Sequence, residues 1–255
     1  MSISSSDTPE LDLLLEKKVE QLREFRQKQE GVWLIVSGAH LVSRNLIVAL
    51  TKDGRLPLIS THRLMMWQTI NAYLMESFFP LIDRRLDEGY ALLRMAAEHT
   101  RDLIRIGDDQ TKLEIWEKHK DGKKEKQLYR DAFKFNKSDK LEEHIYNLYN
   151  LTTDHGVHGH QTASSFSEML RVSPDGKIIS LTVSDLGVYQ GLLVWLKSFF
   201  PLQQLCLRTF EASFGNATSQ AVASYRQMWE AFDKTVVQIQ QSVQEMQADE
   251  YNGLN

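Results

Sequence analysis

The chain has 255 residues, 42% of them hydrophobic and 25% charged. This balance is typical of a soluble globular protein with a hydrophobic core, and the length allows one large domain or two small ones. A formal net charge of -4 excludes a global attraction to nucleic acid or to an anionic membrane, so such contacts would need a local patch. The single cysteine, Cys206, excludes an internal disulfide and a cysteine-rich zinc site. We therefore expect a cytoplasmic protein that does not enter a membrane.

The N-terminal fifth of the chain predicts a tail and two helices. Residues 1–9 lack an apolar pattern and also lack the basic segment and apolar run of a signal peptide, so we expect a disordered tail. Pro9 suits the first turn of a helix, and Gly31 kinks or breaks that helix before a second one at 32–50. The second segment is apolar, but polar side chains interrupt it, which indicates a core helix rather than a membrane span.

Two further helices are expected before residue 110. Ser60 and Thr61 can cap a helix that reaches about Phe79, where Pro80 kinks or ends it. The next runs from Asp87 to Ile106 and is stopped by the turn residues that begin at Gly107.

The middle of the chain is more polar and contains the only predicted strands. Residues 112–135 are helical but strongly charged, and Asp121-Gly122 can split them. A helix capped by Ser138-Asp139 follows at 140–154. Around residues 168–183, alternating apolar residues flank the turn 173–177, which predicts a two-stranded hairpin.

Two long helices, at 185–214 and about 217–248, complete the prediction. The sequence thus predicts a mainly α fold: one bundle-like domain over residues 10–250, with about seven helices and a small β-hairpin. The last helix carries an apolar stripe that forms either core or the seam of a homodimer.

A charged wedge lies on the helix at 87–106. Residues placed at about 100° steps give two apolar faces, which is typical of a helix buried between neighbours. The wedge between these faces has two interpretations: a ladder of intrahelical ion pairs, or a site whose arginine forks bind an anion such as phosphate. Its charged residues are Asp87, Arg94, Glu98, Arg101, Asp102 and Arg105.

The same helix carries an arginine and a histidine five positions apart, Arg94 and His99. This Arg-x4-His spacing resembles the motif of HEPN ribonucleases, all-helical proteins of bacterial defence and toxin systems. The resemblance implies metal-independent RNA cleavage, with His99 acting on the 2′-hydroxyl and Arg94 stabilising the phosphate. On a helical wheel, however, His99 lies about 140° from Arg94, on the apolar side.

Histidines crowd the segment after the helix at 140–154. His155, His158 and His160 have a spacing that can ligate zinc, but no cysteine or second acidic ligand is placed with them, so we expect no metal. His155 continues the apolar stripe of the preceding helix, so we expect it to point inward and to meet Glu98 or Arg94. The alternative is a structural hydrogen bond at the helix end.

A broader resemblance covers roughly residues 60–165. An apolar helix with Leu93, Arg94 and Glu98 is followed, some fifty residues later, by a helix with Tyr146 and Tyr149. A Ser/Thr- and His-containing loop then begins near Thr152. This order resembles a group of uncharacterised bacterial all-α proteins that are distantly HEPN-like.

The densest basic run is Lys118–Lys126, which is either solvated surface or, together with the arginines of the wedge, a place for phosphates. No Walker loop, GxGxxG, GxSxG or HExxH motif occurs, so no cofactor is expected. We favour a non-catalytic binding or interaction protein with an Arg-rich crevice for RNA, another anionic ligand or a partner. The alternative is a HEPN-like endoribonuclease. The residues expected to bind the ligand are Arg94, Glu98, Arg101, Arg105 and His155.

Overall fold

A computed structural model describes residues 9–51, 58–83, 85–156, 170–172, 178–181, 185–214 and 216–252. These residues are mainly helical, which confirms the predicted fold class. Within them lie nine helices and two short strands. The helices are α1 (Pro9–Lys28), α2 (Glu30–Thr51), α3 (Leu58–Ile82), α4 (Leu86–Ile106), α5 (Gln110–Lys118), α6 (Lys123–Ala132), α7 (Lys140–Gly156), α9 (Asp185–Phe214) and α10 (Asn216–Asn252).

The nine helices of the described residues exceed the predicted number of about seven, because both of the possible breaks that the sequence offers, near Gly31 and at Asp121-Gly122, are real. The first helix ends at Lys28, so the break precedes Gly31, and the charged segment separates into α5 and α6 with Gly122 as the N-cap of α6. Pro9 begins α1. The rest of the predicted tail lies outside the described residues.

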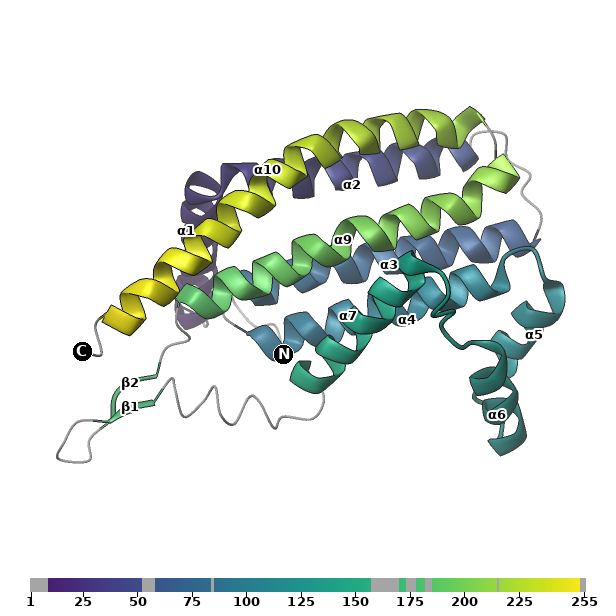
Figure 1. Cartoon of the computed structure of the whole chain (residues 1–255), viewed down its shortest axis with the longest axis horizontal. Helices are drawn as coiled ribbons and strands as arrows, with labels where there is room; N and C mark the ends of the chain where they lie inside the picture. Colours follow the sequence, from purple (N-terminus) through teal and green to yellow (C-terminus); the bar gives the residue numbers. More distant parts are fainter. Residues whose placement is uncertain are drawn as a thin grey trace.

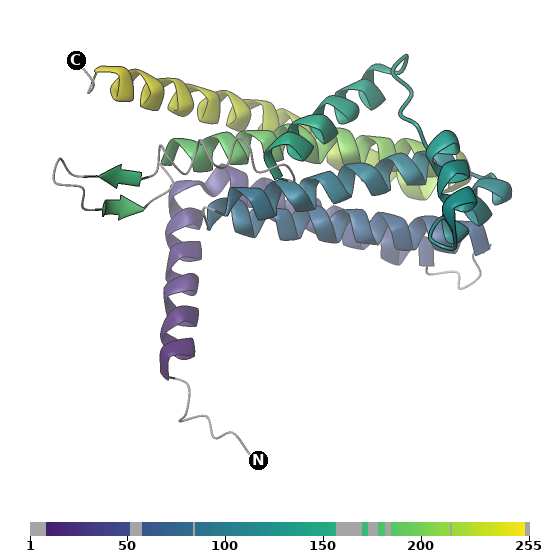
Figure 2. The same ribbon diagram turned by 90° about the horizontal axis from the view of Figure 1, so that it is seen from below.

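Helix α4 lies at the centre of the packing. It contacts α3, α7 and α9, while α10 packs on α2 and α9 (Figure 1). Helices α5 and α6 lie off one end of this bundle, and the two strands lie off the other (Figures 1 and 2). The apolar stripe of α10 contributes to the core, since Phe232 and Ile239 are buried. Among the described residues, the largest hydrophobic side chains sealed in the core are Trp67, Phe78, Trp195, Phe199, Phe200 and Phe210.

Two prolines lie inside helices. α3 continues past Pro80 to Ile82, so this proline occupies the last turn, whereas Pro201 lies well within α9. A proline has no N–H to donate to the carbonyl four residues earlier, which for Pro201 is the carbonyl of Lys197. His144 of α7 places its Nε2 3.3 Å from that oxygen, so a side chain from a neighbouring helix replaces the missing backbone donor.

The helix ends around α4 are set by local chemistry. Gly107 has a φ of +48° and closes α4 by donating its N–H to Leu103 O. The Asp109 carboxylate accepts the first backbone N–H groups of α5, and the Asp139 carboxylate does the same for α7. The N–H of Glu142 and the Arg208 guanidinium lower the pKa of Asp139. The predicted cap at Ser138-Asp139 is therefore confirmed for Asp139.

The strands β1 (Leu170–Val172) and β2 (Ile178–Leu181) pair antiparallel, with Leu170 opposite Leu181. They lie within the range where the sequence predicts a hairpin, and its turn at 173–177 is outside the described residues. Among the helices of the described ranges, none is long and apolar enough to cross a membrane.

Helices α3 and α4 approach closely at Gly89. A Cβ added there would lie 2.5 Å from Leu81 Cδ2 and 3.2 Å from Ser77 O. We expect Gly89→Ala to lower the free energy of unfolding by about 1–3 kcal/mol through overpacking, measured by urea denaturation. In a helix without this constraint, Gly→Ala would stabilise by about 1 kcal/mol.

The sign of the change in unfolding free energy therefore tests the close approach of α3 and α4 at Gly89. A Gly89→Ala protein that is more stable than wild type would contradict it. Ala72→Gly, at an exposed position of α3, reports the intrinsic helix cost of about 1 kcal/mol without any packing contribution.

Candidate functional site

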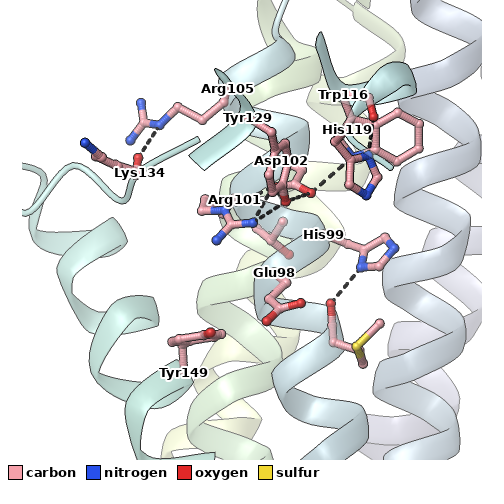
Figure 3. A network of polar contacts seen from close by, with 12 residues as sticks. Glu98, His99, Arg101, Asp102, Arg105, Trp116, His119, Tyr129, Lys134 and Tyr149 are labelled. Atoms are coloured by element: carbon pink, nitrogen blue, oxygen red, sulfur yellow. Dashed lines mark hydrogen bonds and ion pairs between the residues drawn. The ribbon is translucent and has the colours of Figure 1, made fainter. Parts of the chain in front are cut away.

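The charged wedge of α4 contains one buried carboxylate. Asp102 is 4% exposed and accepts hydrogen bonds from two aromatic side chains that α5 and α6 supply. Trp116 Nε1 donates to Oδ2 at 3.1 Å, and the Tyr129 hydroxyl lies 2.8 Å from the same oxygen (Figure 3). A buried charge is tolerated only when it is paired and hydrogen-bonded, so these contacts fix α5 and α6 on α4.

Arg101 provides the positive charge for this carboxylate. Its Nη2 lies 2.7 Å from Asp102 Oδ1 and 2.6 Å from the Tyr129 hydroxyl. Its guanidinium also lies over the rings of Tyr129 and Phe135, at 5.6 and 5.5 Å from their centroids. Burial, and then the Asp102 carboxylate, raise the pKa of Tyr129 well above its usual value, so this hydroxyl remains a neutral donor.

We call Asp102 with its partners Arg101, Trp116 and Tyr129 the Asp102 anchor. An aromatic stack supports this anchor from the α5–α6 side. The His119 ring stacks on Tyr129 at 4.8 Å, and Tyr129 stacks on Phe133 at 4.7 Å. His119 Nδ1 also hydrogen-bonds to the carbonyl of Trp116. These contacts hold the Tyr129 ring in place, so its hydroxyl is aimed at Asp102.

Arg105 makes the corresponding link to α7. Its Nε donates to Lys134 O at 2.7 Å, and its Nη2 donates to the buried carboxylate of Glu142. Glu142 also accepts the N–H of Asn136 at 2.8 Å. The donors of Arg101 and Arg105, which the sequence suggests for an anion, are thus directed at acceptors of the protein itself.

Arg94 and Glu98 form the first rung of the ladder that the sequence predicts. Arg94 Nε lies 3.2 Å from Glu98 Oε1, and the Arg94 guanidinium lies 5.3 Å from the centre of the Tyr149 ring on α7. About a quarter of each charged side chain remains exposed. Arg94 is therefore the most open arginine of the three in the predicted site.

His99 faces a different neighbour. Its Nδ1 lies 2.9 Å from Met95 O, and its ring meets Tyr73 of α3 edge-on at 5.3 Å. Figure 3 shows His99 and Tyr149 on opposite sides of α4. Arg94 and His99 are therefore directed to different helices within one chain, as the angle of about 140° predicts.

The histidine segment is only partly described. His155 lies in the last turn of α7, but its side chain, together with His158 and His160, lies outside the part of the chain that the structure describes. The predicted contact of His155 with Glu98 or Arg94 remains a prediction. Among the described residues, no group of three or more His, Cys, Asp or Glu side chains could hold a metal ion.

Sequence reasoning missed the partners that give this site its form, above all Trp116, Tyr129 and Glu142. The signal was present in the segment 112–135, where aromatic residues recur among charges. A purely solvated helix would not need Trp116, Tyr129 and Phe133.

Comparison with known proteins found no match for this chain. No protein-family model matches the chain, and neither a curated protein nor a solved structure matches it. The function must therefore be inferred from the residues themselves.

The Asp102 anchor can be tested by removing its carboxylate. We expect Asp102→Ala to lower the free energy of unfolding by about 3 kcal/mol, because Arg101, Trp116 and Tyr129 lose a shared acceptor. Urea denaturation measures the loss, and hydrogen exchange should accelerate mainly in α5 and α6.

The matched control is Asp131→Ala on α6, which removes an exposed carboxylate paired with Lys134. It should leave stability almost unchanged. Equal effects of the two substitutions would show that Asp102 is not the anchor.

Proposed function

We propose that this protein is a non-catalytic binding protein that holds an anionic partner through the basic face of α5–α6. Five exposed lysines of the run Lys118–Lys126 support this most directly. None of the five has an ion-pair partner among the residues that the structure describes. They are Lys118, Lys120, Lys123, Lys124 and Lys126.

The distribution of charge supports a local patch. Residues 110–137 contain nine lysines and arginines against five acidic residues, although acidic residues are in excess over the whole chain. Helices α5 and α6 are attached to α4 but extend beyond the other helices at one end of the bundle (Figure 1). In 0.1 M salt, charges more than about 10 Å apart are largely screened from one another. Acidic residues of the bundle at such distances therefore change the positive potential of this patch little.

The anchor at Asp102 supplies the rigidity that such a patch needs. It fixes Trp116 and Tyr129 against α4, while the five lysines of the same helices and their connection are exposed to solvent. Preorganised groups lose less entropy on binding, so a fixed patch binds a polyanion more tightly than a flexible one. The proposal retains the predicted binding function but moves its main contact from Arg101 and Arg105 to these lysines.

The HEPN-like ribonuclease that uses Arg94 and His99 remains the alternative. It has less support, because His99 contacts Tyr73 while Arg94 contacts Tyr149. An Arg94 and a His99 that act on the same phosphodiester would therefore have to come from two copies of the chain.

Binding can be tested with a fluorescent single-stranded RNA and anisotropy over a range of salt concentrations. We expect Lys123→Glu with Lys124→Glu to weaken binding at every salt concentration. The slope of log K against log salt should become shallower by about 1.4, since each phosphate contact to a single strand contributes about 0.7.

Arg44→Glu with Lys234→Glu is the control, because it changes the net charge equally at exposed positions of α2 and α10. This variant should bind nearly as wild type does. RNA binding that is absent in wild type, or equally weakened in both variants, would refute a patch on α5–α6.

Catalysis is tested in the same samples by following RNA length in EDTA. We expect intact RNA with both wild type and His99→Ala. Metal-independent cleavage by wild type that His99→Ala abolishes, with an unchanged melting temperature, would instead establish the ribonuclease.

A further inference from the structure

We propose that α1 is a self-association arm that pairs antiparallel with α1 of a second copy of this chain. Helix α1 points away from the bundle (Figure 2). Two contacts attach it to the bundle: the Phe25 ring meets Phe78 at 5.4 Å, and Lys18 Nζ lies 2.7 Å from Asp83 Oδ2. Residues 9–17 come before both contacts and project beyond them (Figure 2).

Helix α1 carries apolar side chains that face solvent, both in its projecting part and next to the Lys18 contact. Leu13, Leu15 and Val19 are 52%, 55% and 47% exposed. Leu15 and Val19 are four residues apart and Leu22 follows three later, so these three share one side of the helix. A single helix gains most of its stability from packing such a face, so α1 requires a neighbour along this side.

The charges of α1 identify a second copy as that neighbour. Residues 9–16 contain three acidic residues and no basic one, whereas residues 21–28 contain three basic residues and one acidic one. Two copies in antiparallel orientation place the acidic half of each beside the basic half of the other. A parallel pair would place like charges together, so the helix is complementary to itself only about a two-fold axis perpendicular to its length.

Other exposed apolar residues lack this complementarity. Leu34, Leu41 and Val48 form a stripe on the outer side of α2, seven residues apart. Helix α2 carries one acidic and one basic residue, Glu30 and Arg44, which are too few charges to form an acidic and a basic half like those of α1. The stripe therefore offers a control surface rather than a second candidate.

Sedimentation velocity of the full-length protein tests the proposal. We expect a concentration-dependent dimer in wild type, and Val19→Glu should raise its dissociation constant at least about tenfold by placing a charge in the apolar seam. Leu34→Glu, a matched substitution on α2, should leave the dimer unchanged. A monomeric wild type, or a dimer that Val19→Glu does not weaken, would overturn the proposal.

Charge reversal tests the orientation. Glu16→Arg and Arg23→Glu should each weaken the dimer, and the double variant should restore it, because both halves exchange sign. In a parallel pair neither residue faces an opposite charge, so single reversals without effect would overturn the antiparallel arrangement. The bundle should remain folded in each variant, since all these side chains are exposed, and its thermal unfolding followed by circular dichroism checks this.

Discussion

The hydrogen bonds of the buried Asp102 carboxylate hold helices α5 and α6 on one end of the bundle. Helices α5 and α6 bury little apolar surface: Leu113 is the buried residue of α5, and α6 itself has none. Hydrophobic packing alone would hold them weakly. A carboxylate that accepts from Arg101, Trp116 and Tyr129 is costly to leave unpaired, so detachment of α5–α6 would expose this cost in full.

The arginines of α4 suit this purpose better than lysines would. A guanidinium presents donors in a planar fork and can reach two acceptors at once. Arg101 reaches Asp102 and the Tyr129 hydroxyl, and Arg105 reaches Glu142 and the Lys134 carbonyl. Each arginine thereby joins α4 to chain segments distant in sequence, and the charged wedge becomes a structural junction between α4, α5–α6 and α7.

Local features of the sequence predicted much of the helical framework. α4 and α9 begin and end within a residue of the predicted bounds, because periodicity and nearby turn residues determine those bounds. The direction of His99 also followed from its helical angle. The partners of Asp102 could not be predicted in the same way, since Trp116 and Tyr129 lie 14 and 27 residues away and meet it only after α5–α6 folds back.

Helices α5 and α6 show why net charge is a poor guide to what this protein binds. Tyr129 and Phe133 are four residues apart, so both lie on the side of the chain that faces Asp102 and the bundle. Lys124, five residues before Tyr129, lies about 140° from it and so on the opposite side of α6. Like the other lysines of the run it is exposed and has no ion-pair partner among the described residues. The attachment of these lysine-rich helices to the bundle therefore depends on one buried negative charge, that of Asp102, with its donors on α4, α5 and α6.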